Sequence, residues 1–369
     1  MAEVTNYIDR LVAELCPDGV EYRPLGELLG YEQPTKYLVS SKDYDDSYPT
    51  PVLTAGKTFI LGYTNETKGI YPASEEEPVI IFDDFTTAFK WVEFPFKAKS
   101  SAMKMLTLKS GTDSLFKYVY YAMQCIVYNS SDHARQWISK YSNIEIPVPP
   151  MEIQEAIVEI LDKFTNLEAE LEAELEARTL QYEYYRDSLF EALDCPRVPL
   201  DSFAKIKNGK TYKEFGAGNI PVYGSGGIMT YVDRSSYDKP TVLIPRKGSL
   251  GNLFYLEEPF WNVDTIFYTE IDEEQVIPKF LYYFLKTAHL EDLNTAGGVP
   301  SLTQKVLNKV LIPVPSLEEQ QRIVDILDRF DALTSSLSEG LPAELAARRN
   351  QYEYYRDQLL TFPRKGENQ

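Results

Sequence analysis

Apolar residues recur at helical spacing in two long stretches of the chain, residues 150–195 and 316–362. In each stretch the steps are mostly three and four residues, a mean period near 3.5 that is typical of helices packed against another helix. The first seam comprises Ile157, Leu161, Phe164, Leu171, Leu175, Tyr182, Tyr185 and Leu189. The second comprises Ile323, Leu327, Phe330, Leu337, Leu341, Leu345, Tyr352, Tyr355 and Leu359. Each pattern predicts one long helix.

The ends of these helices also carry local signals. Ser316 followed by Glu319 is a capping box, and Pro196 and Pro363 lie just beyond the last apolar positions. About 40 residues would extend about 60 Å, which is longer than a globular core requires, so we expect the two helices to pair antiparallel as a spacer. The residues expected in this pair and in partner docking are Phe164, Leu171, Leu175, Tyr182, Tyr185, Phe330, Leu341, Leu345, Tyr352 and Tyr355.

The chain is a tandem repeat. Residues 146–164 return in similar form at 312–330, and Gln-Tyr-Glu-Tyr-Tyr-Arg-Asp at 181–187 returns unchanged at 351–357. Weaker matches extend upstream of both helices. The start of the chain resembles the segment after the first helix, so the N-terminus is expected to supply what would otherwise follow the second helix.

Upstream of each helix lies a β-rich segment. Val79–Phe82 and Val242–Pro245 have the apolar runs of buried strands, glycines at 224–227 indicate a turn, and 117–127 and 278–287 are typical of short helices. The sequence therefore predicts an α+β fold with two α/β modules and two long helices, related by a pseudo-twofold repeat. The predicted parts are an N-terminal segment 1–19, modules 20–149 and 196–315, helices 150–195 and 316–362, and a tail 363–369.

Charge is distributed unevenly along the 369 residues. The net charge is −19, but residues 151–195 hold 13 acids and 3 bases, whereas residues 196–315 hold 13 of each. Much of the excess therefore belongs to the exposed face of one predicted helix. Each module keeps a stretch of lysines free of acids that could face phosphate, and for the second stretch plain solvation is the alternative. The stretches are Lys97, Lys99, Lys104 and Lys109 in the first module, and Lys205, Lys207, Lys210 and Lys213 in the second.

Composition indicates an ordinary globular protein. Apolar residues make up 44% of the chain, and no apolar run reaches the ~20 residues of a membrane span. Met1-Ala2-Glu3 does not resemble a secretory leader, so we expect a cytoplasmic protein without membrane contact. Cys16, Cys125 and Cys195 are far apart and indicate neither a disulfide framework nor a metal site.

The order module, helix, module, helix, with Ile-Pro-Val-Pro leading into Ile-Val-x-Ile-Leu-Asp-x-Phe twice, resembles the specificity subunit of type I restriction-modification systems over nearly the whole chain. The resemblance implies two target-recognition domains, each reading half of a split site in double-stranded DNA. It also implies an antiparallel coiled coil that sets their separation and docks two modification subunits. Those subunits carry S-adenosylmethionine and methylate adenine, and restriction subunits join through them, while this chain is non-catalytic and binds no cofactor.

Two loops resemble recognition loops of that family, residues 245–254 and residues 82–90. At the offset of 163 that aligns Val79 with Val242, Asp83 and Asp84 fall opposite Arg246 and Lys247, so the modules are expected to present different chemistry at equivalent places. The alternative for these residues is a solvated turn. The candidate DNA contacts are Lys57, Asp84, Thr86, Thr87, Lys90, Lys210, Ser225, Arg246, Lys247, Ser249 and Asn252.

Several enzymatic functions are not supported. The chain has no Asn/Asp-Pro-Pro-Tyr/Phe motif for amino methylation, and the Gly-Lys-Thr triplets at 56–58 and 209–211 lack the earlier glycine of a phosphate loop. Alternative functions are the specificity subunit of a system whose modification and cleavage chain is fused, a coiled-coil adaptor, or an acidic DNA-mimic inhibitor. The charge balance of residues 196–315 argues against a mimic.

Overall fold

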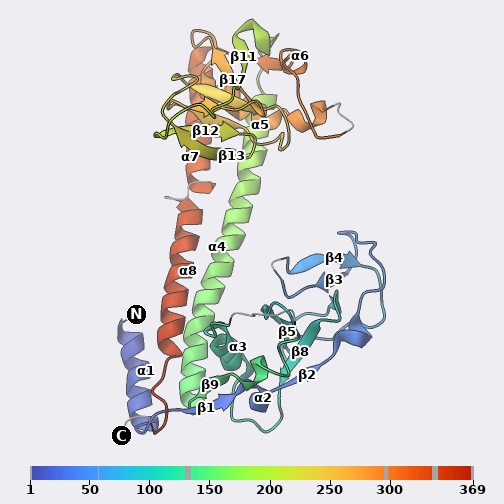
Figure 1. Cartoon of the computed structure of the whole chain (residues 1–369), viewed down its shortest axis with the longest axis vertical. Coiled ribbons are helices and arrows are strands. Elements are labelled where there is room, and N and C mark those ends of the chain that lie inside the picture. The colour runs from blue at the N-terminus through green and yellow to red at the C-terminus, as the bar shows by residue number, and fades with distance from the viewer. Residues whose placement is uncertain (1, 57, 129–133, 295–297, 335–339, 367–369) are drawn as a thin grey trace. The chain divides into compact units, whose positions relative to one another are not determined.

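A computed structural model describes the chain except for residues 1, 57, 129–133, 295–297, 335–339 and 367–369 (Figure 1). The chain divides into two compact units. Unit 1 comprises residues 1–169 and 347–369, and unit 2 comprises residues 170–346. Because these boundaries fall within helices, each unit combines a β-rich module with parts of the long helices.

Unit 1 begins with a helix and continues through small sheets. Its elements are α1 (Ala2–Leu15), β1 (Glu21–Pro24), α2 (Leu25–Leu28), β2 (Leu29–Glu32), η1 (Pro34–Tyr37), β3 (Thr50–Leu53), β4 (Ile60–Thr64), β5 (Val79–Asp83), β6 (Phe89–Val92), β7 (Lys97–Ala98), β8 (Met103–Leu108), α3 (Phe116–Gln124), η2 (Tyr141–Asn143) and β9 (Glu145–Val148). The 41-residue helix α4 (Met151–Glu191) starts here and ends in unit 2, which confirms the first predicted long helix.

Unit 2 repeats the order of strands. Its elements are β10 (Arg197–Pro199), η3 (Leu200–Ser202), β11 (Ala204–Asn208), β12 (Ile220–Gly224), β13 (Gly227–Val232), β14 (Thr241–Pro245), β15 (Phe254–Leu256), β16 (Trp261–Asn262), β17 (Ile266–Ile271), α5 (Pro278–Thr287), η4 (Leu290–Leu293), α6 (Gln304–Leu307), β18 (Leu311–Pro313) and α7 (Leu317–Thr334). Helix α8 (Gly340–Leu359) starts in unit 2 and ends in unit 1. The predicted second long helix is thus described as α7 and α8, and Leu337 lies outside the described residues.

The two modules share one topology. The four-stranded sheets have the orders β2-β8-β5-β6 and β11-β17-β14-β15, and the three-stranded sheets have the orders β4-β3-β7 and β13-β12-β16. The two-stranded sheets β1-β9 and β10-β18 are antiparallel in both units. The predicted tandem α+β repeat is confirmed strand by strand.

Each four-stranded sheet has an apolar central strand because both of its faces are buried. In β5, Ile80 and Phe82 face the larger core beneath α3, whereas Val79 and Ile81 face a second, smaller core. In β14, Val242 and Ile244 face the larger core of unit 2, and Leu243 faces the smaller one. A strand covered on both sides has no polar face, which is why these runs are continuously apolar.

A buried glutamine fixes each module to the first turn of its long helix. Gln154 accepts a hydrogen bond from the Leu115 amide at 2.9 Å and donates to the carbonyls of Asp113 and Pro149. Gln320 accepts from the Ile277 amide at 2.8 Å and donates to the carbonyls of Gln275 and Pro315. Each amide side chain therefore satisfies three backbone groups at the start of a short helix and a long one.

A tyrosine–aspartate contact repeats further along each helix. The Tyr121 hydroxyl donates to Asp162 Oδ1 at 2.5 Å, and Lys117 Nζ lies 3.2 Å from the same oxygen. In unit 2, Tyr283 donates to Asp328 Oδ1 at 2.6 Å, and Lys279 Nζ lies 2.9 Å from Asp328 Oδ2. Burial raises the pKa of both tyrosines far above the usual value, so each stays a hydrogen-bond donor.

Aromatic side chains join the helices within each unit. In unit 1, Phe164 stacks on Tyr355 with ring centroids 5.7 Å apart, and Arg349 Nε lies 2.6 Å from Glu168 Oε1. Contacts that rise along α4 thus fall along α8, so these segments are antiparallel. In unit 2, Phe330 stacks on Tyr185 at 5.8 Å and packs near Tyr182 at 6.3 Å. Leu345 is buried, and Leu171, Leu175 and Leu341 are half-buried.

The two ends of the chain meet in unit 1. The Val20 amide donates to the carbonyl of Pro363 at 2.8 Å, and the Lys365 amide donates to Val20 at 2.9 Å. Gly19 has φ +93°, and a Cβ there would lie 2.8 Å from the Arg364 carbonyl carbon, so only glycine fits. Figure 1 shows the start of the chain in blue beside the red end of α8, and Ile8 and Leu359 share one core.

The buried glutamine gives a matched test. Gln320→Ala should lower the free energy of unfolding by about 1–3 kcal/mol, because it leaves buried backbone groups without partners. The adjacent Gln321→Ala should change it by less than about 0.5 kcal/mol, since the Gln321 side chain is exposed and bonds Asp325 on the same helix. Urea denaturation checks both values; equal effects of the two variants would contradict the anchoring role.

Candidate nucleic-acid interface

The predicted recognition loop of unit 2 follows β14 and is held by backbone hydrogen bonds. The amides of Arg246 and Lys247 both donate to the carbonyl of Thr265, at 2.8 and 3.2 Å. The Gly248 amide donates to Pro300, and the Leu302 amide donates to Arg246. Segments around residues 246, 265 and 301 are thereby fixed to one another, which makes the loop a defined surface.

The turn between β12 and β13 joins the same surface. The Ser225 amide donates to Thr265 Oγ1 at 3.3 Å, and Asn252 Nδ2 donates to the Ser225 carbonyl at 3.1 Å. Lys247, Ser249 and Asn252 are exposed, while Ser225 is half-buried. The structure therefore brings together five of the predicted contact residues, Ser225, Arg246, Lys247, Ser249 and Asn252.

Two contacts orient the guanidinium of Arg246. Nη1 donates to the Asp264 carbonyl at 3.2 Å, and the guanidinium carbon lies 5.9 Å from the centre of the Phe267 ring. The side chain is half-buried, so these contacts orient it and leave its remaining N–H groups available. A pre-oriented planar fork is the group that proteins use for bidentate contacts to guanine or phosphate.

Lys210 lies at the edge of the smaller sheet of unit 2. Its amide donates to the Asn262 carbonyl, and its own carbonyl accepts from Trp261 Nε1, both at 2.9 Å. The backbone is fixed and the side chain is exposed. This arrangement suits a phosphate contact, which positions a protein without reading sequence.

The corresponding turn of unit 1 is built around Asp83. Its carboxylate accepts hydrogen bonds from the amides of Phe85 and Thr86 at 2.9 and 2.8 Å. Thr86 and Lys90 are exposed, and Thr87, at φ 59°, is half-buried. These three predicted contacts therefore lie on or near one turn, while Lys57 lies outside the described residues.

Asp84 is buried, in contrast to the expectation that it faces DNA. Asp84 and Lys104 are both 0% exposed, with Lys104 Nζ 2.9 Å from Asp84 Oδ2. Asp84 Oδ1 accepts from the Trp137 amide at 2.8 Å, and Lys104 Nζ also donates to Gln33. We therefore assign Asp84 a structural role, fixing the turn and the segment that contains Trp137.

Strand faces correct the alignment of the two loops. Ile80 of β5 and Val242 of β14 face the larger core of their units, which excludes the odd offset of 163. The amides of Asp84 and Arg246 donate to the carbonyls directly before β8 and β17, those of Ala102 and Thr265, which fixes the offset at 162. Asp84 then lies opposite Arg246. In unit 1, Lys104 pairs across the sheet with Phe82. In unit 2, Phe267 pairs with Ile244, so Lys104 and Phe267 occupy equivalent positions. A buried ion pair in one module thus replaces an arginine over an aromatic ring in the other.

Two of the first-module lysines that were expected to face phosphate are buried instead: Lys104 is paired with Asp84, and Lys97 with Glu66. Lys104 lies in the run Met-Lys-Met-Leu-Thr-Leu, whose residues 103–106 are buried as well. A lone lysine inside an apolar strand was the available signal, because a charge at such a position needs a buried partner.

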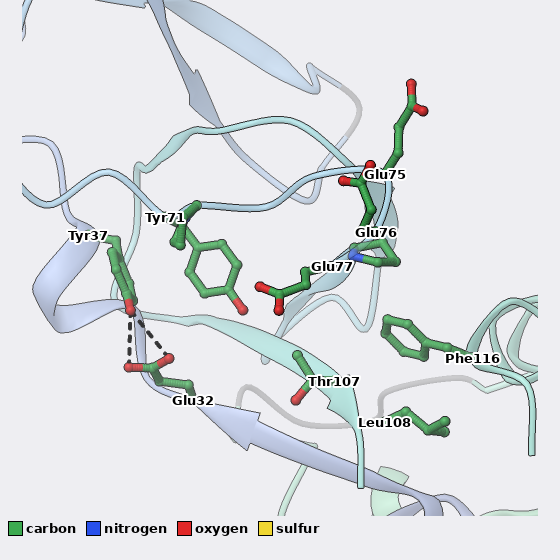
Figure 2. A pocket seen from close by; sticks show the side chains of 11 residues that line it. Glu32, Tyr37, Tyr71, Glu75, Glu76, Glu77, Thr107, Leu108 and Phe116 are labelled. Carbon is green, nitrogen blue, oxygen red and sulfur yellow. Dashed lines mark hydrogen bonds between the residues drawn. The ribbon is translucent and has the colours of Figure 1, made fainter. Parts of the chain in front are cut away.

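A hollow of about 670 Å³ in unit 1 has the opposite electrostatic character (Figure 2). Its lining contains Glu32, Glu75, Glu76 and Glu77 beside Tyr37, Tyr71 and Phe116. Burial, with a contribution from Glu32, raises the pKa of Tyr71 to about 12. Since four carboxylates repel phosphate, this hollow does not belong to a nucleic-acid surface.

Other site chemistry has no support in the described part of the chain. The residues that the structure describes contain no cluster of three or more His, Cys, Asp or Glu side chains able to hold a metal ion. Among the described helices, none is both long and apolar enough to cross a membrane.

The structural role of Asp84 can be tested by removing its charge alone and then together with that of Lys104. Asp84→Asn should lower the free energy of unfolding by about 3–5 kcal/mol, because Lys104 is then buried without a counter-charge. Adding Lys104→Met should restore most of the loss, since the carboxamide oxygen that Asp84→Asn leaves in place can still accept from the Trp137 amide. Urea denaturation of the single and double variants measures both effects. If the double variant is stable and its complex with modification subunits methylates a changed first half-site, Asp84 reads DNA instead.

Comparison with known proteins agrees with this geometry. Residues 17–177 and 194–347 match the family described as Type I restriction modification DNA specificity domain. The chain is 45% identical over 401 aligned residues to the type I restriction enzyme EcoR124I/EcoR124II specificity subunit of Escherichia coli, covering 97% of this chain and 98% of that one. It is 30% identical to a putative type I specificity subunit of Haemophilus influenzae, covering 93% and 96% of the two chains. The fold matches the crystal structure of a type I restriction-modification S subunit from M. genitalium with a TM-score of 0.58 at 19% identity, covering 93% and 96% of the chains. The chain therefore belongs to the family of type I restriction-modification specificity subunits.

Proposed function

We propose that this protein is the DNA-recognition and scaffold subunit of a type I restriction-modification complex, in which each unit reads one half of a bipartite site. The observation that carries this proposal is the repeated module with different chemistry at one place. Asp84 with Lys104 in unit 1 corresponds to Arg246 over Phe267 in unit 2. Two modules with one topology and different loop chemistry fit the reading of two different sequences.

Partner docking is proposed for the repeated ends of the helices. Tyr184 is 70% exposed and Tyr354 is 58% exposed, at the same position of the repeated heptapeptide. Each lies edge-on to the next tyrosine, with centroids 5.7 and 5.2 Å apart. Large exposed aromatic side chains are typical anchors of protein interfaces. Two equivalent surfaces suit two copies of one partner, the modification subunit, through which restriction subunits join.

The chemistry is proposed to reside in those partners. S-adenosylmethionine would bind the modification subunit, and this chain would supply recognition and spacing without a cofactor of its own. Because the substrate is chromosomal and invading DNA, we propose a cytoplasmic location. Sequencing of methylated bases in a host with and without the gene tests the proposal: a bipartite motif methylated only when the gene is present is expected, and identical patterns would refute it.

Arg246 provides a test of base reading. Arg246→Ala should weaken binding of the complex to its site by about 1–3 kcal/mol and relax specificity in the second half-site, because the oriented fork is lost. Lys210→Ala should weaken all sequences alike and lower the salt dependence of binding. Affinity measured against salt on specific and scrambled duplexes separates these effects. An unchanged affinity and methylation pattern for Arg246→Ala would show that the loop does not read bases.

The central helix is expected to set the gap between half-sites. Residues 167–178 contain Leu-Glu-Ala-x three times within α4, and family members are known to vary their gap through short repeats here. Four helical residues add about 6 Å of rise and about 40° of net rotation. One base pair adds about 3.4 Å and about 35°. Rotation therefore favours a step of one base pair, whereas rise allows up to two.

Deleting residues 171–174 should accordingly shorten the unread gap by one base pair, with two as the upper limit, and leave both half-sites unchanged. The methylated motif of a host carrying the deletion gives the answer directly. An active deletion variant that keeps the original gap would contradict the spacing role.

A further inference from the structure

Each unit has a β-hairpin in its three-stranded sheet, β3–β4 in unit 1 and β12–β13 in unit 2. The second strand of this hairpin exposes apolar side chains in both units. In unit 2, Ile228 is 51% exposed and Met229 is 58% exposed at the start of β13. In unit 1, Ile60 is 37% exposed and Leu61 is 39% exposed at the start of β4. Both strands are at the edge of their three-stranded sheets, where soluble proteins normally place charged or polar residues to prevent pairing with other chains.

The hairpin register shows that these positions are equivalent. Ile60 stands opposite Leu53, and Ile228 stands opposite Tyr223. Both hairpins also carry an irregularity at the same point, directly before Leu53 and directly before Tyr223. Bulges of this kind re-aim the side chains that follow them. The exposed apolar pair is therefore a repeated construction of the module.

In unit 2 this pair is continuous with the recognition loop. The turn before Ile228 is held to the loop by the Asn252 hydrogen bond to the Ser225 carbonyl. Met229 packs over the turn, since a Cβ on Gly224 would lie 2.8 Å from its sulfur. Exposed Lys247 and the oriented Arg246 lie in that loop. The hairpin that carries the apolar pair is thus joined to the loop that carries the two cationic residues.

We propose that these apolar pairs insert between adjacent base pairs of the half-site that their unit reads. The inference rests on the proposed recognition function. Ile, Leu and Met are among the side chains that proteins use as wedges to unstack base steps, and neighbouring cations hold the phosphates while they do so. Unstacking also serves modification, because an enzyme that acts on a base must extrude it from the duplex. Lys247 and Arg246 in the joined loop favour a phosphate-bearing partner over an apolar protein surface.

The test uses the full chain assembled with its modification subunits, and an unmethylated duplex that contains the motif identified by methylation sequencing. The variant combines Ile228→Ala with Met229→Ala, and the matched control is Leu311→Ala, which removes an apolar side chain 53% exposed on β18 of the same unit. The double variant should bind the matched duplex roughly 10- to 100-fold more weakly, the cost of unstacking one step without a wedge. The control should bind like the parent complex.

A mismatch scan identifies the wedge itself. When a mismatched pair already weakens stacking at the inserted step, the double variant should recover to within about 3-fold of the parent complex, since the unstacking cost is then mostly removed. Mismatches in the first half-site should not restore the affinity of this double variant. They should restore the affinity of the corresponding unit 1 variant, which combines Ile60→Ala with Leu61→Ala. The parent complex should also raise the fluorescence of 2-aminopurine at that step, and the variant should not.

Each other outcome overturns the inference. Unchanged affinity, or a loss that no mismatch restores, excludes a wedge. A loss of modification subunits from the double variant in size-exclusion chromatography assigns the surface to protein docking. If the parent complex itself binds no sequence specifically, the recognition function fails, which is distinguishable from failure of the wedge alone.

Discussion

The attachment of each module to the first turns of a long helix is the constraint on which the rest of the structure depends. Gln154 and Gln320 are fully buried, and each satisfies one backbone amide and two backbone carbonyls. The tyrosine–aspartate pairs further along, Tyr121–Asp162 and Tyr283–Asp328, prevent rotation about that first contact. Hydrogen bonds inside a core have strict geometry, so the module has a single orientation relative to the helix start.

The same repeat explains how one continuous chain forms two units that share the helices α4 and α8. Unit 1 takes the start of α4 and most of α8, and unit 2 takes the rest of α4 together with α7. Phe164 on Tyr355 and Phe330 on Tyr185 are the same contact made twice. In unit 1 the chain ends are joined by hydrogen bonds of Val20 to Pro363 and Lys365. In unit 1, hydrogen bonds therefore join the end of α8 to the segment before β1. In unit 2 the corresponding connection, from α4 to β10, is the continuous chain.

Within this shared framework, recognition is varied where packing permits it. The turn after the central strand carries a buried ion pair, Asp84 with Lys104, in one unit and Arg246 over Phe267 in the other. The ion pair removes charge from the surface, whereas the arginine keeps part of its guanidinium accessible. The edge strand of the hairpin exposes an apolar pair in both units. Variable polar groups and a constant apolar pair are consistent with one mode of DNA contact that reads two sequences.

The sequence by itself determined the repeat, the long central helix, the strand–helix order of the modules and the family, because all of these follow from local periodicity and from motifs that occur twice. It also indicated the segment around Arg246 as a surface loop. Only the tertiary structure decided that Asp84 is buried against Lys104, that the modules align at an offset of 162, and that Ser225 joins the loop of Arg246. These facts depend on which strands pair and which faces they bury. Residues 20 positions apart, such as Asp84 and Lys104, meet only through cross-strand register, and no local pattern specifies that register.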